Sequence, residues 1–121
     1  MIATRTVETA TILDLQGPLA SGQDDAGLRQ AVRLAFDNGA RTVILNMEAV
    51  PAVDSSGVAA LASAHLTAVN RGGQLRLCNL TQKLKDVFTI MRLDAVFDAY
   101  DTEVAAVASN TAPPAAKRAD S

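Results

Sequence analysis

The strongest candidate for chemistry in this sequence is the tetrapeptide Asp54-Ser55-Ser56-Gly57. A purely structural interpretation is open, because Asp and Ser are favoured helix N-caps and Gly57 would relieve crowding in the first helical turn. The functional interpretation is that a serine hydroxyl is displayed where a strand passes into a helix. Without a base to activate it, such a hydroxyl is a poor nucleophile but an accessible phosphoacceptor.

Phosphorylation at this position would change the local charge more than the fold. A phosphate adds about −1.5 to −2 charge at pH 7, and a helix N-terminus tolerates an anion. The Asp54 carboxylate, and any partner surface fitted to a neutral hydroxyl, would not tolerate it. The tetrapeptide therefore suggests a switch in which binding is lost while the domain stays folded.

The other reactive side chains give little support to catalysis. His65 is the only histidine, and ten residues of helix would place it about 15 Å from Ser55, whereas a catalytic hydrogen bond spans about 3 Å. We expect His65 to be a partly buried helix residue. Cys78 is the only cysteine, and we expect it to be a small core residue rather than a reactive thiol.

Nucleotide and metal sites are unsupported as well. Gly17 and Gly22 have the spacing that begins a phosphate-binding loop, but Gln23 and Asp24 follow where Lys and Ser or Thr are needed. The acids around Asp24 do not match a calcium loop, and Cys78 lacks a nearby ligand partner. We therefore expect a protein without enzymatic activity, cofactor or metal.

Composition narrows the class further. The chain has 121 residues, 49% of them hydrophobic and 20% charged, which is typical of one globular domain. The net charge of −2 gives no electrostatic reason to expect a nucleic-acid or anionic-membrane partner. The first five residues lack the layout of a signal peptide, and no apolar run approaches the roughly 18 residues of a membrane span. We expect a soluble, cytoplasmic protein.

The apolar patterning predicts strands and helices in alternation after an initial hairpin. Expected strands cover residues 2–8, 11–16, 42–45, 74–78 and 96–100, and expected helices lie around residues 28–36, 55–69, 84–91 and 103–108. This order predicts a single α/β domain over residues 1–108, with a mixed sheet of about five strands and about four helices. The hairpin is antiparallel and the remainder largely parallel.

Two further segments bear on function. Sites in such sheets gather at the carboxyl ends of parallel strands, which directs attention to the loop at residues 46–56. Residues 109–121 are small, polar and proline-bearing, and we expect a disordered tail.

Five basic residues between positions 71 and 92 are interpreted as a solvated surface or as a face for an acidic protein partner: Arg71, Arg76, Lys83, Lys85 and Arg92.

From about residue 2 to residue 108, the sequence resembles a STAS domain of the bacterial anti-sigma factor antagonists, or anti-anti-sigma factors. The resemblance rests first on an apolar strand with Asn46, followed after a short loop by Val-Asp-Ser-Ser-Gly-Val at residues 53–58. Arg-Gly-Gly at 71–73, Cys-Asn-Leu at 78–80 and the helix from Leu84 to Leu93 also fit. In this order and spacing the combination is specific.

The resemblance implies a partner-switching regulator of transcription. In that family the unphosphorylated antagonist binds an anti-sigma factor that is also an ATP-dependent serine kinase, so the sigma factor is released. The kinase phosphorylates the first serine after the motif aspartate, here Ser55, and a PP2C-type phosphatase restores the active form. Asp54, Ser56 and Gly57 would shape the docking surface around Ser55. Both a monomer and a weak dimer are compatible with this role.

One departure from the family pattern leaves an alternative open. The family commonly has an acidic residue in a Gly-x-Leu-Asp turn near the phosphoacceptor, whereas this chain has Gly17-Pro18-Leu19-Ala20. The missing carboxylate at Ala20 is compatible with altered partner choice. It also motivates a second hypothesis, a non-phosphorylated STAS scaffold subunit of a larger complex such as a stressosome or a lipid-transport assembly.

Overall fold

The computed structural model describes residues 2–19 and 23–108 of the chain. It contains, in chain order, β1 (Ile2–Val7), β2 (Ala10–Gln16), α1 (Gln23–Asp37), β3 (Thr42–Ala49), α2 (Ser55–Asn70), β4 (Gln74–Cys78), α3 (Gln82–Ile90), the short 3₁₀ helix η1 (Leu93–Ala95), β5 (Asp98–Tyr100) and α4 (Glu103–Ala108). The predicted tail at residues 109–121 lies outside the described residues.

The five strands form one mixed sheet in the order β1-β2-β3-β4-β5. The hairpin of β1 and β2 is antiparallel, and β2, β3, β4 and β5 pair in parallel, as the sequence predicts. The apolar strand β3 is central. The register between β2 and β3 shifts after Asp14, just before the chain leaves the sheet at Gly17.

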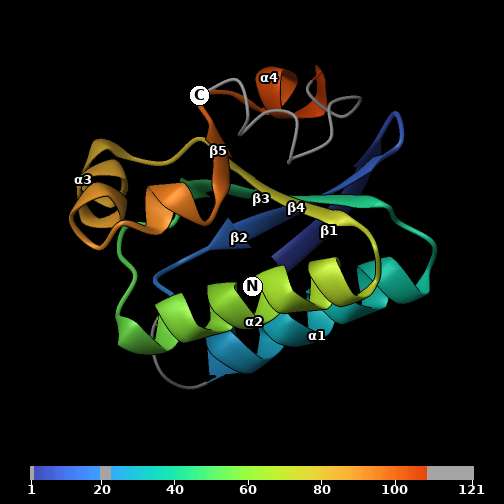
Figure 1. The fold of residues 1–121 in the computed structure, drawn as a ribbon, viewed down its shortest axis with the longest axis horizontal. Helices are drawn as coiled ribbons and strands as arrows, with labels where there is room; N and C mark the ends of the chain where they lie inside the picture. The colour runs from blue at the N-terminus through green and yellow to red at the C-terminus, as the bar shows by residue number, and fades with distance from the viewer. Residues whose placement is uncertain (1, 20–22, 109–121) are drawn as a thin grey trace.

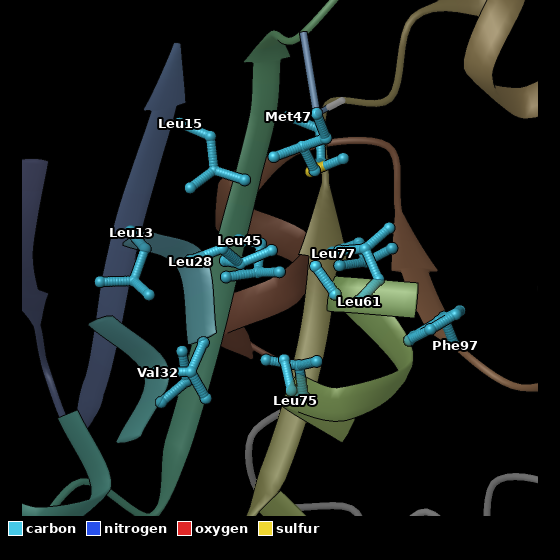
Figure 2. Close-up of a cluster of buried hydrophobic side chains, with 14 of the residues drawn as sticks. Leu13, Leu15, Leu28, Val32, Leu45, Met47, Leu61, Leu75, Leu77 and Phe97 are labelled. Carbon is cyan, nitrogen blue, oxygen red and sulfur yellow. The ribbon is translucent and has the colours of Figure 1, made fainter. Parts of the chain in front are cut away.

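The sheet separates two unequal apolar layers. Helices α1 and α2 lie side by side along one face, and α4 lies on the other (Figure 1). The larger core fills the space between the sheet and α1 and α2, where Leu45, Leu61 and Leu77 are fully buried (Figure 2). Strand β4 shows the division, because Leu75 faces this core whereas Cys78 belongs to a smaller cluster under α4.

Local sequence determines where several helices begin and end. The side chain of Thr81 accepts a hydrogen bond from the backbone N–H of Leu84 and caps the beginning of α3. Gly39 and Gly72 follow α1 and α2 with φ angles of +101° and +70°, a left-handed conformation that favours glycine. None of the described helices has the length and apolar character needed to cross a membrane.

Two predictions need correction. The last strand begins at Asp98 rather than at residue 96, because the backbone N–H groups of Val96 and Phe97 bond to Leu93 in the η1 turn. Phe97 is buried, and its ring packs against Phe88. Its backbone is not part of the strand. Arg76 was assigned to a basic surface, but it is only 1% exposed, so the five basic residues do not form one solvated face.

Candidate functional site

Ser55 is the first residue of α2 and is exposed. It follows the loop that leaves the carboxyl end of β3, the region in which parallel sheets gather their sites (Figure 1). The next residue, Ser56, is partly buried, and Gly57 is buried. Ser55 is therefore the more exposed of the two serines among the four predicted site residues.

Asp54 fixes the start of α2. Its backbone is extended, and its Oδ1 accepts a hydrogen bond of 2.9 Å from the backbone N–H of Gly57. Its carbonyl oxygen accepts from the backbone N–H of Val58, which closes the first helical turn. Asp54 is therefore the N-cap, and Ser55 stands at the positive end of the helix dipole, where an added anion is tolerated.

Gly57 is required by a neighbouring chain segment rather than by the helix itself. A Cβ at this position would lie 2.2 Å from the carbonyl oxygen of Leu19 and 2.8 Å from a methyl group of Val53. Leu19 belongs to the connection between β2 and α1 and is itself buried. The glycine therefore allows this connection to cross the beginning of α2 in direct backbone contact.

The same connection supports the loop that carries Ser55. The backbone N–H of Leu19 donates to the carbonyl of Ala52, and the N–H of Asp54 donates to the carbonyl of Leu19, at 3.0 and 3.1 Å. Gly17 donates in the same way to Ala49. Both backbone groups of the buried Leu19, its N–H and its carbonyl, therefore bond to the loop that carries Ser55. Ala20, where the family's acid is missing, lies outside the described residues.

The sequence did not predict a network of polar side chains at the base of this loop. The Asn46 side chain donates from Nδ2 to Asp14 Oδ1 at 2.8 Å, and its Oδ1 accepts from the backbone N–H of Glu48 and from the Asn79 side chain. Arg5 forms a two-point ion pair with Asp14 at 2.5 and 2.8 Å. The network joins β1 and β2 and the segment after β4 to β3, the strand from which the loop to α2 originates.

The network also sets the charge state of its acid. The hydrogen bonds from Arg5 and from Asn46 hold the pKa of the Asp14 carboxyl below its ordinary value. Asp14 therefore remains anionic at neutral pH and keeps both donors bound. The signal in the sequence was an aspartate between two leucines of a strand, because Asp needs partners when it is partly buried.

The remaining reactive residues lie away from Ser55. His65 lies ten residues along α2, with its ring edge-on to Phe97 at a centroid distance of 5.6 Å. Cys78 is fully buried, and burial raises the pKa of its thiol to about 12. Both therefore have the structural positions predicted for them. Within residues 2–19 and 23–108, no group of three or more His, Cys, Asp or Glu residues could hold a metal ion.

Comparisons with known proteins agree on the fold. A family model described as STAS domain matches residues 1–106. The phosphorylated form of the Bacillus cell fate determinant SpoIIAA is 24% identical, with a TM-score of 0.66 over 88% of this chain and 96% of that one. An anti-sigma factor antagonist from Mycobacterium paratuberculosis is 16% identical, with a TM-score of 0.77 over 91% of this chain and 92% of that one.

A third similar structure comes from a different functional context. A sulfate transporter family protein from Wolinella succinogenes is 20% identical, with a TM-score of 0.71 over 88% of both chains. A comparison with curated protein sequences gives no match. At these identities the structural likeness establishes the architecture, and the choice of function depends on what the residues around Ser55 can do.

Proposed function

This chain belongs to the STAS domain family, and we propose that it is a cytoplasmic anti-sigma factor antagonist switched by phosphorylation of Ser55. In its unphosphorylated form it binds an anti-sigma factor that is also an ATP-dependent serine kinase, and a sigma factor is freed. The kinase ends this state by phosphorylating Ser55, and a PP2C-type phosphatase reverses the modification. The chain itself performs no catalysis.

The observation that carries the proposal is that Ser55 is an exposed residue at the first position of α2. A kinase needs an accessible hydroxyl, and the helix N-terminus beside it accepts the anion that forms. The described surroundings contain no triad that could turn Ser55 into a nucleophile, since His65 lies about 15 Å along the helix axis. The likeness to two proteins named as SpoIIAA and as an anti-sigma factor antagonist supports the same role.

The proposed switch acts through desolvation and charge at the interface. A partner that covers Ser55 and Asp54 must bury the new phosphate next to an existing carboxylate. Leaving such a charge without a counter-ion in an interface costs about 3–5 kcal/mol, which corresponds to a loss of affinity on the order of 10²- to 10⁴-fold. The unbound domain does not incur this desolvation cost, because a phosphate on Ser55 stays hydrated when no partner covers it.

Phosphate transfer is the direct test of the site. The chain is incubated with the serine-kinase anti-sigma factor encoded in the same genome and ATP, and the products are analysed by mass spectrometry. We expect one phosphate, on Ser55, with none on Ser55→Ala. Ser56→Ala is the matched control for the position of the phosphate: whatever its rate of reaction, its phosphate is expected on Ser55. A phosphate found solely on another residue would refute the assignment.

Binding of substituted chains tests the switch separately from the chemistry. We expect Ser55→Ala to bind the kinase constitutively and Ser55→Asp to bind poorly, in a titration with the purified partner. Both are expected to melt close to the wild type, because residue 55 is exposed. If Ser55→Asp unfolds the domain, its loss of binding is explained without a switch, and the proposal loses this support.

The alternative is a non-phosphorylated scaffold subunit of a larger assembly, such as a stressosome or a lipid-transport complex. It is supported by the missing acid at Ala20 and by the likeness to a sulfate transporter family protein. Affinity purification with the full chain distinguishes the two roles. Recovery of an ATPase with serine-kinase activity supports the antagonist, and recovery of transporter or scaffold subunits without it supports the alternative.

A further inference from the structure

Helix α4 covers the face of the sheet opposite α1 and α2 (Figure 1). It is six residues long, and only Ala106 and Val107 are buried. They pack on a small cluster that includes Ile12, Ile44 and Cys78, all without exposed surface. In the described part of the chain, a very short helix thus separates fully buried apolar side chains from solvent.

The polar contacts of α4 lie mostly at its surface. Glu103 forms an ion pair with Arg5 at 2.6 Å, and the two side chains are 27% and 41% exposed. At the other end, the buried Arg76 guanidinium donates to the carbonyl of Ala106 at 3.2 Å. The hydroxyl of Thr102 accepts from the backbone N–H of Ala105 and begins the helix.

These contacts can be lost without dismantling the sheet. An isolated six-residue helix is not stable in water, so α4 is maintained by its packing on the sheet. Segments with few buried apolar contacts open at a lower free energy than the global unfolding of the domain. Arg5 keeps its two bonds to Asp14 when Glu103 departs, so the network below the Ser55 loop does not depend on α4.

We infer that α4 is a lid, which opens while the rest of the domain stays folded and uncovers an apolar surface on the sheet. This surface consists of Ala10, Ile12, Ile44 and Cys78. It lies on the opposite face of the sheet from α2, whose first residue is Ser55. The surface does not include Ser55, so its exposure does not depend on the proposed function.

Cys78 provides a reporter for the opening, because it is the only cysteine in the chain and lies beneath the lid. While the lid is closed, the thiol is inaccessible, and burial raises its pKa to about 12. An excess of an aromatic disulfide reagent at about pH 8 labels the ionised thiol once it reaches solvent. The labelling rate of the full chain is compared with the rate that global unfolding permits, measured by urea denaturation and circular dichroism.

We expect the wild type to be labelled at least about tenfold faster than global unfolding permits. We also expect a weaker dependence on urea concentration than global unfolding has, because lid opening exposes only a small part of the surface that global unfolding exposes. Labelling that follows global unfolding with its full urea dependence would overturn the inference.

Substitutions within α4 identify the element that opens. Val107 is 8% exposed and Val104 is 78% exposed, so the same change to Ala at the two positions is a matched pair. Val107→Ala removes buried methyl groups and is expected to accelerate labelling about tenfold, whereas Val104→Ala stays within about twofold of the wild type.

Glu103→Gln provides a second route if Val107→Ala does not fold. It weakens the exposed ion pair with Arg5 and is expected to accelerate labelling about two- to fivefold. If neither Val107→Ala nor Glu103→Gln is labelled faster than Val104→Ala, Cys78 is reached by another route and α4 is not a lid.

Discussion

Gly57→Ala is the substitution that tests how the loop carrying Ser55 is held. The added Cβ would lie 2.2 Å from the carbonyl oxygen of Leu19 and 2.9 Å from its carbonyl carbon. These are backbone atoms, so no change of rotamer relieves the contact. The start of α2 and the connection between β2 and α1 must move apart, and the hydrogen bonds of Leu19 to Ala52 and Asp54 are weakened.

The magnitude follows from three contributions to the free energy of unfolding. Overpacking a close contact costs about 1–3 kcal/mol, and each weakened hydrogen bond costs about 1 kcal/mol. Alanine recovers at most about 1 kcal/mol through its better helix propensity. We therefore expect Gly57→Ala to lower the free energy of unfolding by about 2–4 kcal/mol.

Gly27→Ala is the matched control, because a Cβ at this helical position would meet only the Cδ1 atom of Ile2, at an ordinary 3.9 Å. It is expected to raise the free energy of unfolding by about 0.5–1 kcal/mol. Urea denaturation followed by circular dichroism measures both variants. A Gly57→Ala variant as stable as the wild type, or equal losses in the two variants, would refute the argument from close approach.

Two further substitutions examine the polar groups around the site. Asp54→Ala removes the cap on the Gly57 N–H and should cost about 1 kcal/mol in urea denaturation, whereas Asp54→Asn retains an acceptor and should stay within a few tenths; equal losses would argue against the cap. Asn46→Asp replaces the amide that donates to Asp14, 2.8 Å away, with a second carboxylate. The pair of acids raises the folded-state pKa of one of them, so the stability relative to wild type should be kept at low pH and lost as the pH rises above about 4; thermal melts across this range that show a pH-independent difference would contradict the pairing.

The local parts of the fold were predictable because local interactions determine them. The hairpin, the parallel crossovers and helix α4 at residues 103–108 follow from apolar patterning and turn residues, and the structure agrees. The last strand was predicted two residues too early. Val96 and Phe97 have the composition of a strand, but the η1 turn and the aromatic contact of Phe97 with Phe88 take precedence over that preference.

The reasons behind the site were less accessible than its location. Asp54-Ser55-Ser56-Gly57 was found from residue types alone, yet the need for Gly57 comes from Leu19, which lies 38 positions earlier and contacts it only in the folded chain. The Asp14 network likewise joins residues from separate strands, and no spacing rule connects Arg5 with Asn46. The burial of Arg76 is a third example, because a basic residue in a strand gives no indication of which face a later helix will cover.

The way in which Ser55 is held favours a switch at the interface over a switch in shape. Its loop is bonded to both the N–H and the carbonyl of Leu19, and there is no room for a Cβ where Leu19 passes Gly57. Asp54 caps the helix. A phosphate on an exposed residue displaces no packed side chain, so we expect the backbone of the domain to stay as it is. In the proposed switch, the modification would change instead what a partner must desolvate when it docks. A site held in this way can lose affinity by orders of magnitude while the free energy of unfolding hardly changes, and this combination distinguishes the proposed switch from a phosphorylation that acts by unfolding the loop.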